Sequence, residues 1–381
     1  MPTRSKQKRP EQTTTALKDK RADVKAEATG VAYGAVVGLD VGDRHVHYCM
    51  LDLAGEVIAE GVITTTEQSV RMLLDGKPRM RVALEAGNHS PWISRLLTEL
   101  GHEAIVANAR NLRMISQSDG KNDPADARML ARLARVGPDL LGPIQHRSAD
   151  VQNDLTIIRA REVAVTGRTK LINAVRGLVK STGKRLPGFG SGTFGKKARE
   201  ACPPELKEAL APLLRLIEHL TREIQLYDRM VTKKAPTKYP ETKTICTIPG
   251  VGPLTALAMV LMMNNDPKRF EKSRDVGCYF GLRPIQRQSG ASSPQLGITK
   301  AGDHVFRRLI TQSAQYILGP FGKDCALRRW GLSLAVRGGK NAKKRAVIAV
   351  ARKLSILMHR LWVKQEEFDP ERGLSLATAA A

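Results

Sequence analysis

The stretch Ala35-Val36-Val37-Gly38-Leu39-Asp40-Val41-Gly42 decides how the first part of this chain folds. Its run of apolar, partly β-branched residues predicts a β-strand, and the closing glycine is typical of a turn. Asp40 is unusual inside such a run, because aspartate is depleted in strands. Taken alone, Asp40 is explained most simply as part of a turn near Gly42. An acid inside an apolar run of a strongly basic chain nevertheless needs a reason.

The residues after this strand predict a mixed sheet with helices on its faces. His45–Asp52 and Glu56–Thr64 are two further strands, joined by the turn Leu53-Ala54-Gly55, so an antiparallel meander is expected. The elements expected next are a helix at 67–74, a strand at 80–84, a helix at 91–100, a strand at 103–107 and a helix at 124–134. Three strands followed by alternating strands and helices match the RNase H-like architecture, an α/β fold.

Three further acids stand where they can join Asp40. Glu85 ends the apolar run Arg81-Val82-Ala83-Leu84-Glu85, and Asp123 and Asp126 open a helix in Lys121-Asn122-Asp123-Pro124-Ala125-Asp126-Ala127-Arg128. Each alone has a simpler explanation, Glu85 as a solvated strand end and Asp123 as the N-cap of a helix. Together, the four acids can converge at one end of a sheet. Because such carboxylates repel one another without metal, they favour a site for two Mg²⁺ ions about 4 Å apart.

Two histidines, His45 and His47, fall on one face of the second strand. Metal ligation by this pair is one interpretation. Arg44 stands next to them, however, and favours a face that points to solvent or to nucleic acid.

The overall charge predicts a polyanionic partner. The 381-residue chain has 62 Lys and Arg against 37 Asp and Glu, which gives a formal net charge of +25. This balance favours nucleic acid, and an aromatic content of only 4% favours contacts to phosphates over base stacking. An anionic membrane surface is disfavoured, because no long amphipathic stretch carries Trp or Phe along one face.

The cysteines and the apolar stretches predict a cytoplasmic protein. The five cysteines are scattered without the spacing of zinc ligands, and their odd number argues against a disulfide framework. Residues 1–30 are polar and charged, unlike a secretory signal. The longest apolar stretch, Leu254–Met263, is too short to span a bilayer.

Composition and periodicity predict five regions along the chain. Residues 1–32 are a disordered basic tail, 33–145 an α/β domain, 150–235 a helical hairpin with a loop at 181–204, 240–365 a mostly helical domain, and 366–381 a second tail. The two long helices of the third region are equally consistent with an oligomerising coiled coil.

Several motifs occur in order along residues 35–330. They are Gly38–Gly42, Ala83–Gly87, Lys121–Arg128, Ile248–Pro253, Gly281–Pro284, Gln288–Gly290 and Leu296–Asp303. Together they resemble the DEDD transposases of the insertion sequence 110 family, which are related to the Piv DNA invertases. The chain departs from the family pattern at Gln288-Ser289, where relatives often have two serines, and at Ala291-Ser292-Ser293, which replaces a Gly-Lys type sequence.

The resemblance implies a reaction and a set of partners. A RuvC-like domain would bind Mg²⁺ through the four acids named above, and a C-terminal transposase domain would supply a serine that links covalently to DNA. That serine maps to Ser289, with Ser292 and Ser293 as alternatives. The resemblance also implies exchange between donor and target DNA, guidance by a structured non-coding bridge RNA, and a homo-oligomer, either a dimer or a tetramer.

Glycines and basic residues of the C-terminal region are candidates for contacts to nucleic acid. The turn Pro249-Gly250-Val251-Gly252 precedes an apolar helix, and its backbone amides can hold a phosphate in a contact similar to a helix-hairpin-helix motif. A tight turn between two helices explains the same glycines. The full set of predicted contacts is Gly250, Gly252, Lys300, Arg307, Arg308, Lys343, Lys344 and Arg345.

Two other functions fit the same residues. A RuvC-like nuclease that resolves junctions or selects DNA structures would use the four acids with water as the attacking group, and Ser289 would be dispensable. A non-catalytic nucleic-acid-binding protein would use the acids only as helix caps and ion-pair partners.

Overall fold

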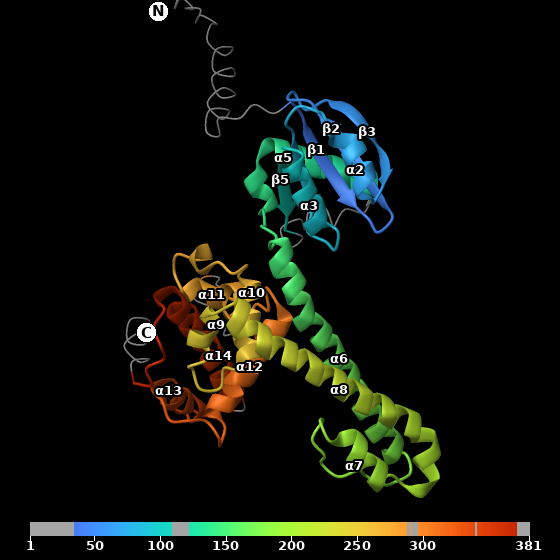
Figure 1. The fold of residues 1–381 in the computed structure, drawn as a ribbon. Helices are drawn as coiled ribbons and strands as arrows, with labels where there is room; N and C mark the ends of the chain where they lie inside the picture. Colours follow the sequence, from blue (N-terminus) through green and yellow to red (C-terminus); the bar gives the residue numbers. More distant parts are fainter. Residues whose placement is uncertain (1–33, 109–121, 288–289, 291–295, 340, 372–381) are drawn as a thin grey trace, which may run out of the picture. The chain divides into compact units, whose positions relative to one another are not determined.

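A computed structural model describes residues 34–108, 122–287, 290, 296–339 and 341–371 (Figure 1). The chain divides into two compact units, Met1–His146 and Arg147–Ala381, which are described in turn. The predicted tail at 1–32 and the three candidate serines, Ser289, Ser292 and Ser293, lie outside the described residues. The finer division into five regions stays a prediction.

The first unit is built on a five-stranded mixed sheet in the order β3-β2-β1-β4-β5. Its strands are β1 Val36–Val41, β2 His45–Leu51, β3 Val57–Thr64, β4 Arg81–Glu85 and β5 Glu103–Ala107; its helices are α2 Glu67–Leu74, α3 Ser90–Glu99, α5 Asp123–Val136 and the 3-10 helix η1 Pro138–Leu141. β1, β2 and β3 pair in antiparallel fashion, whereas β1, β4 and β5 run parallel. The predicted meander and the alternating elements after it are confirmed, each within two residues of its expected ends.

The side chains of this sheet alternate between two faces that are covered by different helices. On one face, Val37 and Leu84 pack with residues of α2 and α3. On the opposite face, Val36 and Ala83 pack with Leu130 of α5. We call this opposite face the α5 face; its buried strand residues are Val36, Cys49, Leu51, Ala83, Ile105 and Ala107.

The second unit is helical over most of its described residues (Figure 1). Its helices are α6 Ala149–Lys180, α7 Phe194–Ala201, η2 Pro204–Leu206, α8 Lys207–Lys238, α9 Glu241–Ile245, α10 Pro253–Met262, η3 Pro267–Arg269, α11 Arg274–Tyr279, α12 His304–Leu318, α13 Ala326–Ala335 and α14 Ala342–Lys364. The predicted combination of a mixed α/β part and a mostly helical remainder is therefore confirmed.

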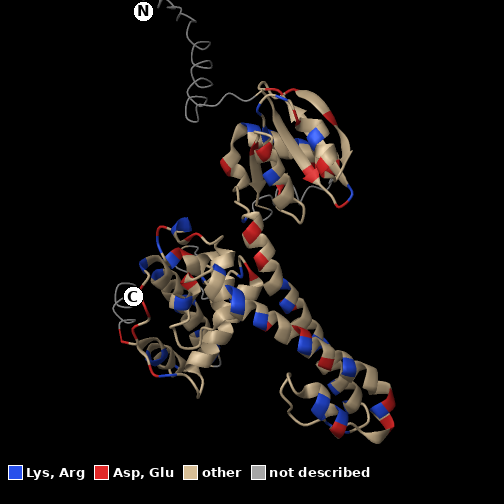
Figure 2. Ribbon diagram, in the orientation of Figure 1, with Lys and Arg blue, Asp and Glu red and all other residues tan. Residues whose placement is uncertain are grey.

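The long helices α6 and α8 lie side by side in opposite directions. Arg161 of α6 pairs with Asp228 of α8, and Arg168, further along α6, donates to Thr221, which lies earlier in α8. This is the geometry expected of a helical hairpin; the alternative of an oligomerising coiled coil stays a prediction. Lys and Arg are interspersed with Asp and Glu along both helices (Figure 2).

The stretch 181–204, predicted to be a loop, contains the helix α7, so that prediction is wrong in part. Phe194 and Ala198 of α7 are fully buried in a cluster with Leu214 and Ile217 of α8. Burial of this small apolar stripe outweighs the glycine and lysine content that predicts a loop.

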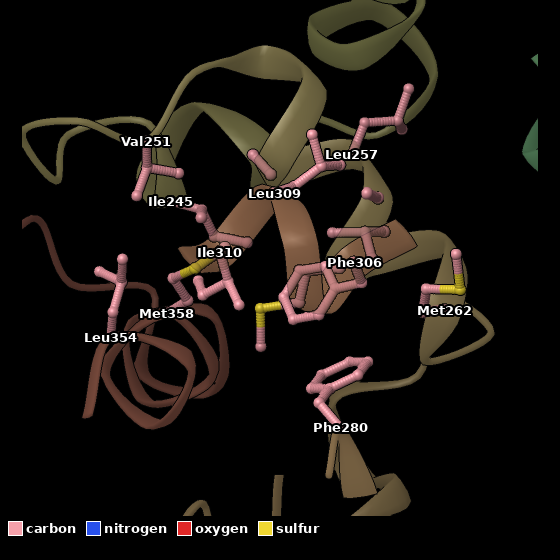
Figure 3. Packing of buried hydrophobic residues seen from close by; sticks show 14 of the residues in the cluster. Ile245, Val251, Leu257, Met262, Phe280, Phe306, Leu309, Ile310, Leu354 and Met358 are labelled. Carbon is pink, nitrogen blue, oxygen red and sulfur yellow. The ribbon is translucent and has the colours of Figure 1, made fainter. Parts of the chain in front are cut away.

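The second unit has a core of its own around α10, α12 and α14 (Figure 3). α10 is apolar on all sides and every residue from Thr255 to Met262 is buried, as expected for a central helix. The rings of Phe280 and Phe306 lie with their centroids 4.0 Å apart, and they join the segment after α11 to α12. No helix among the described residues has the length and apolar character to cross a membrane.

Candidate active site

Two of the predicted acids lie at the same edge of the sheet. Asp40 is near the end of β1 and Glu85 ends β4, and these strands are parallel neighbours whose last paired residues are Leu39 and Leu84. Asp40 therefore lies beside Glu85, one step beyond that pair. Because alternate residues of a strand share a face, both side chains belong to the α5 face.

The other two acids reach this edge because α5 begins there. The N-cap is Asn122, whose side chain accepts a hydrogen bond of 2.9 Å from the amide of Ala125. The interpretation of Asp123 as the N-cap is thus wrong, and Asp123 is not needed to start the helix. Gly38 of β1 lets α5 approach closely, since a Cβ at that position would lie 2.0 Å from the carbonyl oxygen of Ala127.

The charges of the four acids act on one another. Burial, and after it the charges of Asp123, Asp126 and Glu85, raise the pKa of Asp40 from its ordinary 3.8 to about 6, against an opposite effect of His47. Asp126 is only 8% exposed, whereas the side chain of Asp123 is 66% exposed. The structure therefore brings the four predicted acids into one electrostatic group, which we call the acidic centre.

The acidic centre has no Lys or Arg partner within the described residues. A neighbouring acid shows the contrast: Glu60 of β3 forms a 2.6 Å ion pair with Arg128 of α5. Four acids that have no Lys or Arg partner in this part of the chain repel one another, and an external cation would relieve that repulsion.

Sequence reasoning gave metal ligation by His45 and His47 as one interpretation but did not place His47 among the site residues. Its Nε2 atom lies 3.4 Å from a carboxylate oxygen of Asp123, and its side chain is only 21% exposed. His45 is exposed, as expected for a face that points to solvent, whereas His47 is partly buried beside Asp123; that this face meets nucleic acid stays a prediction. The pairing of Asp40 with His47 in the β1–β2 hairpin was the available signal, because it places both residues at one position along the sheet.

The donor atoms of the acidic centre suit a hard divalent cation. Among the described residues, no three Asp, Glu, His or Cys side chains are already close enough to hold a metal ion. Carboxylate oxygens are nevertheless the ligands that Mg²⁺ prefers. The buried Nδ1 atom of His47, which has no hydrogen-bond partner in the described part of the chain, is a further polar group without a role in the fold. The residues present therefore fit a cation by their chemistry.

The segment that contains Ser289 is paired at its base in the second unit. The amide of Ile285 donates to the carbonyl of Gly297 at 2.8 Å, and the amide of Thr299 donates to Arg283 at 2.9 Å. These bonds form two short antiparallel arms. The tip between them, with Ser289, lies outside the described residues, apart from Gly290.

Arg307, predicted to contact nucleic acid, joins the two ends of this segment. Its Nη1 atom donates to the carbonyl oxygens of Phe280, at 3.1 Å, and Ala301, at 2.7 Å. Gly281 and Gly302 have φ angles of 68° and 66°, and a Cβ on either would lie 2.2 Å from a backbone oxygen of the opposite end. The glycines therefore permit, and Arg307 secures, the close approach of the two ends.

The remaining residues predicted to contact nucleic acid differ in their exposure and in their partners within the fold. Arg308 forms a bidentate ion pair with Glu162 of α6. Lys300 and His304 line a shallow hollow beside α12. Exposed cations open α14, namely Lys343, Lys344 and Arg345. Binding of nucleic acid by these residues stays a prediction. Arg308, however, is already engaged in an ion pair within the fold.

The predicted glycine turn precedes α10 as expected. Gly250 has a φ angle of 84°, and a Cβ there would lie 2.8 Å from the ring of Tyr316. Gly252 is the N-cap of α10 and provides no side-chain capping bond. The turn thus packs tightly on α12 and leaves the first amides of α10 without a side-chain cap.

Comparison with known proteins identifies both parts of the chain. Residues 37–183 match the DEDD transposase domain of the IS110 type, and residues 242–323 match a domain described as transposase of the IS116/IS110/IS902 family. The chain is 28% identical over 342 residues to the transposase for insertion sequence element IS1111A of Coxiella burnetii, covering 87% of this chain and 91% of that protein.

Two other relatives extend this picture. The transposase for insertion sequence element IS1328 of Yersinia enterocolitica is 26% identical over 285 residues, which cover 74% of this chain and 83% of that protein. The pilin gene-inverting protein of Moraxella lacunata is 29% identical over 126 residues, or 33% of this chain and 38% of that protein.

The protein is a transposase, an enzyme that acts on DNA. This follows from the matches together with the α/β unit, its acidic edge and the helical second unit. The chain belongs to the IS110 family of insertion-sequence transposases.

Proposed function

We propose that this transposase cuts and rejoins DNA with two groups, the acidic centre and a serine. The acidic centre, Asp40, Glu85, Asp123 and Asp126, would hold Mg²⁺, in a two-ion site, at the edge of a RuvC-like domain. Ser289 would be the nucleophile. The observation that carries the proposal is the gathering of four acids without a Lys or Arg partner among the described residues; burial, and after it the charges of the other three acids, raise the pKa of Asp40 to about 6.

The topology of the first unit supports the RuvC-like assignment. An antiparallel meander is followed by two parallel strands, and the helix α5 packs on the central strand β1. This arrangement delivers one acid from β1, one from β4 and two from the first turn of α5 to one edge.

In the proposed reaction, Ser289 attacks the phosphorus atom of the scissile phosphodiester. Its Oγ atom loses its proton and bonds to phosphorus, while the bond from phosphorus to the leaving deoxyribose oxygen breaks and that oxygen gains a proton. Bound cations supply charge that polarises the phosphate and stabilises the attacking and leaving oxygens. A hydroxyl of the partner strand then attacks the phosphoserine, which restores Ser289 and conserves the phosphodiester bond energy.

The paired base of the serine segment supports a positioned nucleophile. Arg307 of α12 joins the two described ends of the segment through the carbonyls of Phe280 and Ala301.

Contacts to DNA and RNA would come mainly from exposed cations and backbone amides. Lys343, Lys344 and Arg345 are exposed at the start of α14, and the Gly250 to Gly252 turn presents uncapped amides of α10, as in a helix-hairpin-helix contact. With a net charge of +25, binding should weaken steeply as salt rises. By analogy with its family, the protein would use a structured bridge RNA and act as a dimer or tetramer in the cytoplasm, near the nucleoid.

A covalent trapping experiment tests the proposal. The full-length protein is incubated with labelled donor and target DNA, its RNA and Mg²⁺, then denatured, and protein-linked DNA is measured. We expect an adduct with wild type that is lost in Ser289→Ala and Asp126→Ala and is retained in Ser292→Ala and Ser293→Ala. Mg²⁺-dependent cleavage without an adduct would favour the nuclease, and binding without cleavage would favour a non-catalytic protein. Cleavage that persists in excess chelator would rule out the metal assignment.

A further inference from the structure

His47 belongs to the metal site itself, we infer, as a nitrogen ligand beside the four acids. The inference rests on the proposed function, because it concerns the same cation site. His47 is opposite Asp40 in the β1–β2 pair, and residues opposite each other in such a pair have Cβ atoms about 5 Å apart. Alternate residues of a strand share a face, and Cys49 and Leu51 of this strand pack against α5. His47, two residues before Cys49, therefore also lies on the α5 face.

The distance between His47 and Asp123 suits two ligands of one ion. Two donor atoms at right angles, each about 2.1 Å from a cation, lie about 3.0 Å apart, and a wider angle increases the separation. The Nε2 atom of His47 is 3.4 Å from the Oδ2 atom of Asp123. This is longer than a good hydrogen bond between nitrogen and a carboxylate oxygen, which is about 2.8 Å. The two groups face each other without being joined.

Apart from the contact of His47 with Asp123, no hydrogen bond or ion pair of its ring nitrogens is seen among the described residues. Its Nδ1 atom is buried and has no hydrogen-bond partner among the residues the structure describes, which is a costly state for a polar atom. Other buried histidines of the chain are fully engaged. His102 accepts from the amide of Met80 and bonds the carbonyl of Leu74, while His359 bonds Ser273 and Pro267.

A nitrogen ligand would change which cation the centre prefers. Mg²⁺ and Ca²⁺ favour sites made entirely of oxygen, whereas first-row transition metals also bind imidazole, with Mn²⁺ the weakest binder of that series. The centre should therefore bind Mn²⁺ more tightly than four carboxylates alone would, and His47→Gln should lower Mn²⁺ affinity by about tenfold or more while Mg²⁺ affinity changes less. The matched control is His45→Gln, an exposed histidine two residues earlier on the same strand face.

Mn²⁺ bound to the full-length protein without DNA provides a readout independent of activity. Electron spin echo spectroscopy of the bound ion detects a directly coordinated ¹⁴N nucleus. We expect ¹⁴N modulation in wild type and His45→Gln, its loss in His47→Gln, and loss of the bound ion in Asp126→Asn. A thermal unfolding measurement on each variant serves as the control that the variant is folded.

The other outcomes separate the two proposals. Mn²⁺ that binds wild type, is lost in Asp126→Asn, and shows no ¹⁴N modulation would leave the acidic centre in place and overturn the role of His47. Mn²⁺ binding that is unaffected by Asp126→Asn would overturn both, because the acidic centre would then not be the metal site.

Discussion

Asp40 in the first unit and Asp154 in the second are the same residue type in opposite electrostatic surroundings. Burial and three neighbouring acids raise the pKa of Asp40 to about 6. Burial would also raise the pKa of Asp154, but hydrogen bonds from Lys234, Lys238 and Tyr239 more than offset it and hold the pKa at about 2. Burial acts in the same direction on both carboxyls, so the neighbours decide the sign of the shift.

Two further acids of the second unit resemble Asp154, and a third does not. In the second unit, two largely buried acids each meet a cation: Glu162 pairs with Arg308, and Asp303 pairs with Arg159 while it caps α12. Such acids stabilise the fold. Glu241 differs from them, because one of its carboxylate oxygens is buried without a hydrogen-bond partner among the described residues and burial raises its pKa. Within the described residues, the acidic centre has no Lys or Arg partner, so its charges do not add to stability as those of Glu162 and Asp303 do.

The largest effect is expected when a charge of the acidic centre is removed. Asp126→Asn should reduce DNA cleavage by more than about 100-fold, beyond the loss typical of residues that only support a metal ligand. Its melting temperature should stay the same or rise, because one repelling charge disappears. Glu60→Gln is the control, since Glu60 is paired with Arg128 outside the centre. Equal losses of cleavage in the two variants would contradict the distinction between paired and unpaired acids.

The next effect concerns how the acidic centre is assembled. Gly38→Ala places a Cβ 2.0 Å from the carbonyl oxygen of Ala127 and 2.5 Å from the amide of Ala131, which are backbone atoms of α5. The helix must move away, at a cost of about 3 kcal/mol in the free energy of unfolding, and two acids move with it. Gly87→Ala is the control at the same edge, where a Cβ meets nothing within 4 Å. Denaturant unfolding and cleavage assays measure both effects, and similar results for the two variants would refute the close approach.

The sequence predicted the elements that carry the four acids, because alternation, turn residues and helix-start residues are local signals. It could not predict which side chains meet across distant elements. His47 comes beside Asp123 only through the hairpin register with Asp40 and the close approach of α5 at Gly38. Arg308 and Glu162 are 146 residues apart in sequence. The sequence therefore cannot show whether Arg308 is a surface cation or the partner of a distant acid. The nucleophile assignment to Ser289 rests on family resemblance.

A smaller effect is expected in the second unit, on stability alone. Asp154→Ala should lower the free energy of unfolding by about 2 kcal/mol, because the buried hydroxyl of Tyr239 loses its 2.7 Å acceptor and Lys234 loses its partner. The folded pKa of about 2 lies below the ordinary 3.8, so this stability is fully present above about pH 4 and is lost as the pH falls through 2. Asp228→Ala, which breaks an ion pair on the hairpin with a 45% exposed acid, should cost less than about 1 kcal/mol.

The smallest effect has the opposite sign and sharpens the contrast between the two aspartates. The folded pKa of Asp40, about 6, lies above the ordinary 3.8, so the native state holds this proton more tightly than the unfolded state does. The favourable contribution is full below about pH 4 and is lost as the pH rises through 6. In chelator, Asp40→Asn should therefore be more stable than wild type by about 1–2 kcal/mol above pH 6, and equal to it near pH 4. Millimolar Mg²⁺ should shrink this advantage, since a bound cation offsets the repulsion in wild type only. A variant that is less stable than wild type at pH 7.5 in chelator would mean that Asp40 stabilises the fold as Asp154 does, and the contrast between the two units would not hold.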